Sequence, residues 1–221
     1  MPARSAPFDA REPSARGRSE VRPGRSAQAR RRLFLALAVL VIGAGGFSLV
    51  GPMVHHAVRD IGLPLHHADI IRQQARDKHL DPALIAAVID TESKFNDDAG
   101  SSSAGAIGLM QLEPGTARFI ATRSGATRFS TADLATPQVN IAYGSFYLRY
   151  LLDRYGGSTV LAVAAYNGGE ANVDRWLVQA SRRGHDFGVE EIPFPETRAY
   201  VSKVLRLRGD YRATYSSALR L

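Results

Sequence analysis

One glutamate lies where an apolar segment gives way to a polar one, a position that favours acid chemistry. Glu92 follows apolar residues spaced along one helical face between 84 and 89, and residues 96–103 after it are typical of a loop. Asp81-Pro82 combines a helix N-cap with a proline suited to the first helical position, so we expect a helix that ends near Glu92. Burial and the negative helix end would both disfavour the charged carboxyl and raise its pKa. A carboxyl that stays protonated near neutral pH can act as a general acid.

Three further segments carry residues suited to binding a polar ligand. Residues 105–112 combine two glycines, which let a ligand approach the backbone, with an amide and a flexible thioether. Residues 165–169 place a tyrosine and an asparagine beside two glycines, and residues 194–201 contain a further tyrosine. Taken alone, residues 105–112 would also fit a turn in the core. The candidate cleft residues in these segments are Met110, Gln111, Tyr166, Asn167 and Tyr200.

In their order and separations, the four segments together resemble the catalytic domain of the soluble (Slt-type) lytic transglycosylases. That family's pattern is Glu-Ser-x-Phe-Asn, then Gly-Ala-x-Gly-Leu-Met-Gln-Leu-x-Pro-x-Thr-Ala, then Ala-Tyr-Asn-x-Gly, and finally Pro-Glu-Thr-Arg-x-Tyr-Val. Residues 105–117 match the second motif without a mismatch, and the resemblance covers roughly residues 66–207. It implies a goose-type lysozyme fold, which is mainly α and belongs to the lysozyme-like α+β superfamily.

The resemblance implies cleavage of the β-1,4 bond between N-acetylmuramic acid and N-acetylglucosamine in peptidoglycan glycan strands. Glu92 matches the family's single catalytic acid/base. That group protonates the glycosidic oxygen and then takes the proton of the muramoyl C6 hydroxyl as a 1,6-anhydro ring closes. A substrate hydroxyl held in place replaces both water and the second carboxylate that other glycosidases carry about 5–9.5 Å from the acid. No metal or organic cofactor is expected.

The resemblance also implies which side chains contact the sugars. Gln111 and Tyr166 match positions around the cleaved bond, and Met110 offers an apolar contact beside them. Asn167 and Tyr200 fit segments that border the cleft.

One further contact is a loop serine whose assignment stays open. Counting forward from Glu92 points to Ser101, whereas counting back from the second motif points to Ser102, because one residue is inserted in this loop. The chain also departs from the family pattern at two positions. Asp97 stands where proline is usual, and Glu170 stands where the family prefers Pro-Gly after Ala-Tyr-Asn-x-Gly.

The sequence leaves other functions open. Asp97 or Asp98 could supply the second carboxylate of a water-consuming, lysozyme-like hydrolase of the same bond. A catalytically inactive peptidoglycan-binding or scaffold protein, and a wall-opening accessory of a secretion or conjugation apparatus, are further alternatives. The histidine pairs at 55–56 and 66–67 fit a linker better than a metal site, since no cluster of further ligands completes one. Trp176 fits packing better than sugar stacking.

Charge and cysteine content exclude several classes of protein. The chain has 221 residues, with 28 Lys and Arg, 21 Asp and Glu and no cysteine, which excludes a disulfide scaffold and a cysteine nucleophile. Residues 1–32 hold nine arginines against three acids, so nearly all of the net charge of +7 lies there. A near-neutral folded part is unlike a nucleic-acid-binding domain, and we expect no nucleic-acid partner.

The N-terminal residues are typical of a segment that targets a protein to a membrane. We expect residues 1–32 to be a disordered basic cytoplasmic tail. Residues 33–54 are an uncharged run of 22 residues, and as a helix of roughly 33 Å they can cross a bilayer. The arginines before this run orient the rest of the chain toward the periplasm. We favour a single-pass inner-membrane signal anchor over a cleaved signal peptide.

The remaining residues are predicted to form one compact helical catalytic domain. It follows a linker at residues 55–64, spans residues 65–211 and ends in a C-terminal tail at residues 212–221. Helix starts are expected near residue 70 and at Pro82, Pro114, Pro137, Ser158, Glu170 and Pro195. No segment shows the sustained alternation of a strand, so the fold class is mainly α.

Overall fold

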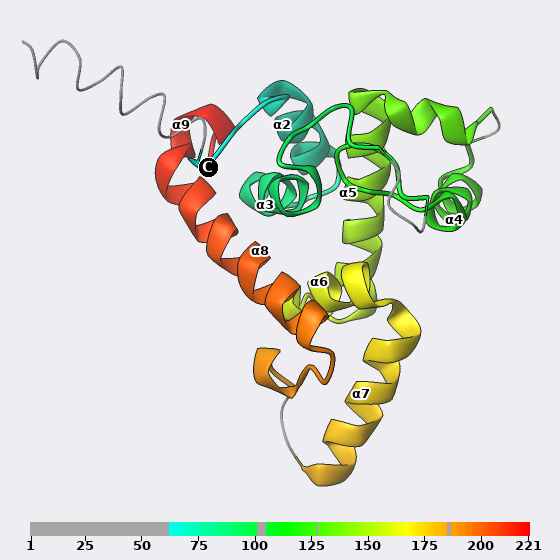
Figure 1. Cartoon of the computed structure of the whole chain (residues 1–221), viewed down its shortest axis with the longest axis vertical. Coiled ribbons are helices and arrows are strands. Elements are labelled where there is room, and N and C mark those ends of the chain that lie inside the picture. The colour runs from blue at the N-terminus through cyan, green and yellow to red at the C-terminus, as the bar shows by residue number, and fades with distance from the viewer. Residues whose placement is uncertain (1–61, 101–104, 127, 185–186) are drawn as a thin grey trace, which may run out of the picture. The chain divides into compact units, whose positions relative to one another are not determined.

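The computed structural model describes residues 62–100, 105–126, 128–184 and 187–221, and these segments are almost entirely helical (Figure 1). The mainly α prediction is therefore confirmed, while the described residues contain no strand beyond one isolated bridge between Ile107 and Leu112. The elements are α2 (Ala68–Asp77), α3 (Pro82–Ser93), α4 (Pro114–Ser124), the 3-10 helix η1 (Thr131–Ala135), α5 (Pro137–Arg154), α6 (Thr159–Gly168), α7 (Glu170–Arg183), the 3-10 helix η2 (Val189–Glu191), α8 (Pro195–Thr214) and α9 (Ser216–Leu219).

The helix starts lie where the sequence predicts them. Four helices begin at a proline, whose missing N–H is no loss in the first turn of a helix. The Asp81 carboxylate accepts a hydrogen bond from the Ala83 N–H and so caps α3, while Ser158 caps α6 by accepting from the Leu161 N–H. The Asp81 cap fixes where α3 begins. It therefore also fixes the place of the last turn of α3, which carries Glu92.

Helix α3 forms the centre of the hydrophobic core. All of its residues from Ala83 to Asp90 are buried, and it packs chiefly against α8 and also against α2 (Figure 1). Helix α6 is buried in the same way through residues 162–165 and packs between α5 and α8. Because the end of each helix reaches the surface from a close-packed core, side chains on their last turns are held on a rigid base.

The C-terminal residues belong to the fold and do not form a tail. Helix α8 continues past residue 211, and α9 follows it and packs on α2. Leu219 is buried, and the Arg72 guanidinium donates to the Ala218 carbonyl oxygen at 2.7 Å. The last part of α8 also contacts the start of the domain, where the Tyr211 hydroxyl donates to the Pro64 carbonyl oxygen. The predicted boundary after residue 211 is corrected accordingly.

The predicted tail at residues 1–32 and the predicted membrane span at residues 33–54 lie outside the described residues. Among the helices that the structure does describe, none has both the length and the hydrophobicity of a membrane span. The membrane anchor therefore stays a prediction.

Candidate active site

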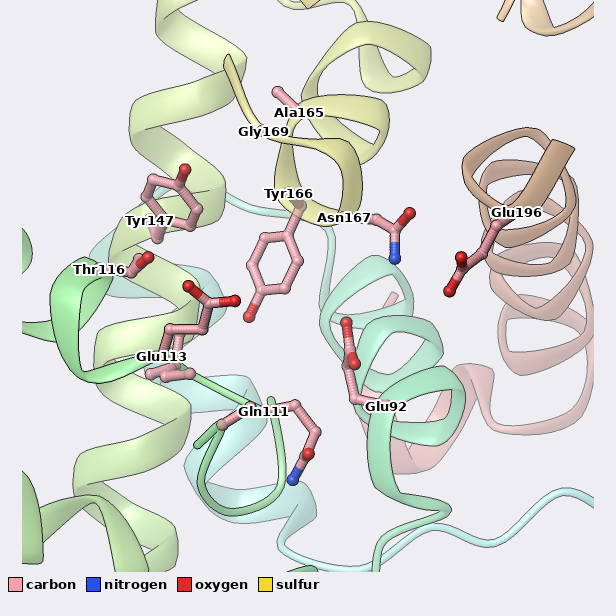
Figure 2. A pocket seen from close by; sticks show the side chains of 12 residues that line it. Glu92, Gln111, Glu113, Thr116, Tyr147, Ala165, Tyr166, Asn167, Gly169 and Glu196 are labelled. Carbon is pink, nitrogen blue, oxygen red and sulfur yellow. The ribbon is translucent and has the colours of Figure 1, made fainter. Parts of the chain in front are cut away.

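A cavity of about 410 Å³ opens beside the end of α3, where Glu92 lies (Figure 2). Three of the other residues predicted from the sequence line it with Glu92. They come from two segments apart from α3: Gln111 from the turn before α4, and Tyr166 and Asn167 from the last turn of α6. The fold thus brings together side chains that are far apart in the sequence.

The Glu92 carboxyl is partly buried, and its environment matches the predicted acid chemistry. Burial raises its pKa to about 7, against opposing effects of a hydrogen bond from Tyr200 and the positive charge of Lys203. The Tyr200 hydroxyl donates to Glu92 Oε1 at 2.5 Å. The predicted direction of the pKa change is confirmed, and burial is its main cause. A carboxyl with this pKa can both donate and accept a proton near neutral pH.

Replacing Tyr200 by Phe should raise the pKa of Glu92 further. The phenol hydrogen bond favours the charged carboxylate, so its loss should move the Glu92 titration upward by about one pH unit. Following the Glu92 side-chain carbon signal by NMR across pH measures this directly. Tyr150→Phe is the matched control, because the Tyr150 hydroxyl donates to Glu170 instead. An unchanged Glu92 titration in Tyr200→Phe would contradict the role given to this hydrogen bond.

A tight turn at residues 105–112 presents Gln111 to the cavity. Two backbone hydrogen bonds of 3.0 Å between Ile107 and Leu112 close this turn. Gly108 has φ 74°, and a Cβ there would lie only 2.7 Å from the Leu134 carbonyl oxygen, so glycine is required. The Gln111 amide is held in place because its Nε2 donates to the Gly108 carbonyl oxygen at 2.8 Å.

The buried Asn140 side chain fastens this turn to the start of α5. Its Oδ1 accepts from the Met110 N–H at 2.8 Å. Its Nδ2 donates to the Ile107 carbonyl oxygen at 2.8 Å and to the Leu134 carbonyl oxygen at 2.9 Å. One amide therefore uses both ends to hold the wall of the cavity.

The predicted sugar contact of Met110 is wrong. Its side chain is fully buried and packs on Gly144 of α5, where a Cβ would collide with the thioether. A flexible apolar side chain suits a core gap as well as a ligand surface, and here it fills the core. Met110 contributes through its carbonyl oxygen, which accepts from the Tyr166 hydroxyl at 2.8 Å and thereby orients that ring.

The remaining predicted site residues lie at different positions relative to the cavity. Tyr166 lies across the cavity from Glu92, and its ring lies 5.5 Å from that of Tyr147 (Figure 2). Asn167 is exposed at the cavity edge. Tyr200 reaches the site through its hydrogen bond to Glu92. Ser101 and Ser102 lie outside the described residues, so the serine contact stays a prediction.

Four polar side chains at the cavity were not predicted from the sequence: Glu113, Thr116, Tyr147 and Glu196. Glu113 and Thr116 lie just after Gln111, within the motif at residues 105–117. Their closeness to Gln111 in the sequence could have indicated that they line the cavity. Tyr147 and Glu196 come from α5 and α8. Glu196 is the glutamate of the fourth family motif, whereas none of the four motifs contains Tyr147. Helix packing alone brings them to the cavity.

Asp97, Asp98 and the histidines do not form part of this site. Asp97 is exposed, and its Oδ1 accepts a 2.8 Å hydrogen bond from His67 Nε2, while neither it nor Asp98 lines the cavity. In the described segments no group of three or more His, Cys, Asp or Glu side chains could hold a metal ion. His55 and His56 lie outside those segments.

Trp176 has the packing role that the sequence predicts. It is buried, and its ring meets Phe194 edge-to-face at 5.0 Å between centroids. It does not line the cavity beside Glu92.

The chain is similar to several known proteins over its helical part. It is 34% identical over 151 residues to the soluble lytic murein transglycosylase of Escherichia coli K12, covering 67% of this chain and 23% of that one. It is 30% identical over 170 residues to the membrane-bound lytic murein transglycosylase C of Edwardsiella ictaluri, covering 66% and 46%. An inactive Glu-to-Gln mutant of lytic transglycosylase Slt from Pseudomonas aeruginosa superposes with a TM-score of 0.64 at 36% identity, covering 72% of this chain and 26% of that one.

The chain spans less than half of the length of each of these relatives. The model of the family described as "Transglycosylase SLT domain" matches residues 69–186, more than half of the chain. This range contains Glu92, the turn with Gln111, and Tyr166. The chain therefore belongs to the transglycosylase SLT domain family.

Proposed function

We propose that this chain is a peptidoglycan lytic transglycosylase that cleaves the β-1,4 bond between N-acetylmuramic acid and N-acetylglucosamine. The observation that carries the proposal is Glu92, a partly buried carboxyl with a pKa of about 7 that faces a polar cavity. The names of the relatives support the substrate class, since they are lytic murein transglycosylases.

In the proposed mechanism, Glu92 acts twice. Its protonated carboxyl first gives its proton to the glycosidic oxygen as the bond to the muramoyl C1 breaks. The resulting carboxylate then takes the proton of the muramoyl C6 hydroxyl, whose oxygen bonds to C1 and closes the 1,6-anhydro ring. The carboxyl ends protonated, as it began. Because the C6 hydroxyl takes the place of water, no water is consumed. The Tyr200 hydrogen bond stabilises the intermediate carboxylate, and Gln111, Tyr166 and Asn167 contact the sugars.

The requirement for a catalytic glutamate has support from a relative. The Pseudomonas Slt structure is that of an inactive mutant in which glutamate is replaced by glutamine. An amide has nearly the shape of a carboxylic acid but cannot supply its proton. Loss of activity on such a change is what an essential acid/base predicts.

Hydrolysis of the same bond is the second candidate function. The sequence suggested Asp97 or Asp98 as a second carboxylate, whereas the structure places Glu113 and Glu196 at the cavity. A glycosidase that consumes water uses two carboxyl groups flanking the bond. The specific observation in its favour is that three carboxyl groups, including Glu92, line one cavity.

Mass spectrometry of the products separates these functions. Purified sacculi digested with the chain should yield soluble muropeptides with 1,6-anhydro ends, each lighter by one water than the hydrolytic product. Reducing ends would contradict the lytic mechanism and support hydrolysis. Absence of soluble products would contradict both and leave the inactive peptidoglycan-binding or scaffold protein.

We also propose that residues 33–54 anchor the chain in the inner membrane, with the SLT domain in the periplasm. The uncharged run and the arginines before it support this placement, and one relative is named as membrane-bound. Cell-envelope or secretion-apparatus partners would then be reached from the periplasmic side. Release of the chain by alkaline extraction of membranes would contradict the anchor.

A further inference from the structure

The charged side chains that line the cavity beside Glu92 are all acidic. Among the described residues, its lining contains three carboxyl groups but no Lys, Arg or His. Glu113 and Glu196 are both exposed, and neither forms a hydrogen bond or ion pair with another described residue through its side chain. They lie on different sides of Glu92, Glu113 just before α4 and Glu196 on the first turn of α8 (Figure 2). Each is therefore free to bind a group of the substrate.

The surroundings of Glu113 offer more than a charge. Glu113 is the N-cap residue of α4, but its side chain does not cap the helix. The carboxylate points into the cavity among Thr116, Tyr147 and Tyr166 (Figure 2). The Tyr147 hydroxyl is directed at the Glu170 carboxylate, 3.5 Å away. A ligand beside Glu113 would thus meet a carboxylate, the Thr116 hydroxyl and the rings of Tyr147 and Tyr166 (Figure 2).

This combination suits a substituted ammonium group. A carboxylate binds ammonium through charge-assisted hydrogen bonds, a hydroxyl oxygen accepts another, and an aromatic face attracts the positive charge. A substrate carboxylate in the same place would be repelled. Peptidoglycan carries ammonium groups in two places: on the diamino acid of a stem peptide, and on a glucosamine that lacks its acetyl group.

We propose that Glu113 is a specificity-determining residue that binds an ammonium group of the glycan substrate. The proposal rests on the proposed function and adds a preference among peptidoglycans. Position 113 is the variable position between Gln-Leu and Pro in the second family motif, so the preference would be a property of this chain. Since Glu113 lies to one side of Glu92, it would set which strand position is bound and leave the acid chemistry unchanged.

The test compares substrates that differ in their amines. The full chain in detergent acts on soluble glycan strands that are untreated, acetylated on their free amines, stripped of stem peptides by an amidase, or enzymatically de-N-acetylated on glucosamine. Acetylation should lower kcat/KM of the wild type roughly tenfold, the effect of one partly exposed charge-assisted hydrogen bond. Glu113→Gln should lose about the same factor on untreated strands and show no further loss on acetylated ones.

The other two substrates identify the source of the ammonium group. If the stem peptide supplies it, amidase treatment should lower wild-type kcat/KM as much as acetylation does. If glucosamine supplies it, de-N-acetylation should raise wild-type kcat/KM and leave that of Glu113→Gln unchanged. Either result supports the proposal, because both show a Glu113-dependent preference for ammonium.

Glu190→Gln is the control for the loss of one surface negative charge, since Glu190 is exposed and lies outside this cavity. It should respond to the four substrates as the wild type does. Equal losses for Glu113→Gln on untreated and acetylated strands, or a kcat/KM equal to that of the wild type on all four substrates, would overturn the proposal. Loss of all turnover in Glu113→Gln would overturn it in favour of a second catalytic carboxylate. An inactive wild type would instead refute the proposed function. Failure of the proposed function can therefore be told apart from failure of the proposal on Glu113.

Discussion

Replacing Glu92 by Gln is expected to abolish muropeptide release and, at alkaline pH, to stabilise the fold. The amide keeps the size of the carboxyl and can still accept the hydrogen bond from Tyr200. It cannot protonate the leaving oxygen, so the rate should fall by at least about 10²–10⁴-fold, the contribution of a positioned general acid. The release of soluble muropeptides from purified sacculi, measured for both proteins at one pH, gives this ratio.

The stability effect follows from the raised pKa of Glu92. The pKa is about 7 in the fold against a model value of 4.5. Between these values the native protein binds more protons than the unfolded chain, so its stability falls as pH rises through this window. Above the native pKa the charged carboxyl should cost about 3 kcal/mol. Glu92→Gln removes this cost, so it should raise the free energy of unfolding at pH 8 by a few kcal/mol and leave it nearly unchanged at pH 4.

Urea denaturation at both pH values measures the difference. Glu190→Gln, which removes an exposed carboxylate, should leave the stability within about 0.5 kcal/mol at either pH. Equal effects of Glu92→Gln at the two pH values would mean that Glu92 ionises like a solvated glutamate. The acid/base role would then lose its physical basis, even if the rate fell.

Helix α3 shows how much of the site the sequence could predict. Its start is determined by Asp81 and Pro82, and its end by the polar loop, all within a short stretch of chain. The apolar pattern between them indicates a buried helix. The place of Glu92 on the last turn, and the direction of its pKa change, follow from these local signals.

The residues that sequence reasoning missed or misjudged depend on packing between distant segments. Tyr147 and Glu196 reach the cavity only because α5 and α8 pack against α6. Met110 was misjudged because a thioether fits both a ligand surface and a core, and only its burial against Gly144 separates the two roles. The C-terminal residues were assigned to a tail because a short helix such as α9 has little pattern of its own.

Asn140→Asp is expected to be among the most destabilising conservative changes in the domain. The side chain is almost fully buried, and its Nδ2 donates to two carbonyl oxygens while Oδ1 accepts from Met110. Aspartate has the same shape but would set a charged oxygen against both carbonyl oxygens. Two lost donors and a buried, unpaired charge should lower the free energy of unfolding at pH 7 by about 3–5 kcal/mol. Urea denaturation beside the wild type measures this loss.

The pH dependence of that loss identifies its cause. Protonation of the new carboxyl removes the charge and restores one donor, so the destabilisation by Asn140→Asp should shrink as pH falls toward 4. Asn167→Asp is the matched control, because that amide is exposed at the cavity edge and should change stability by less than about 0.5 kcal/mol. A loss from Asn140→Asp below about 1 kcal/mol at pH 7 would contradict the role of this amide in holding the turn. Because the turn carries Gln111 and the carbonyl oxygen that orients Tyr166, we expect activity to fall even where the variant remains folded.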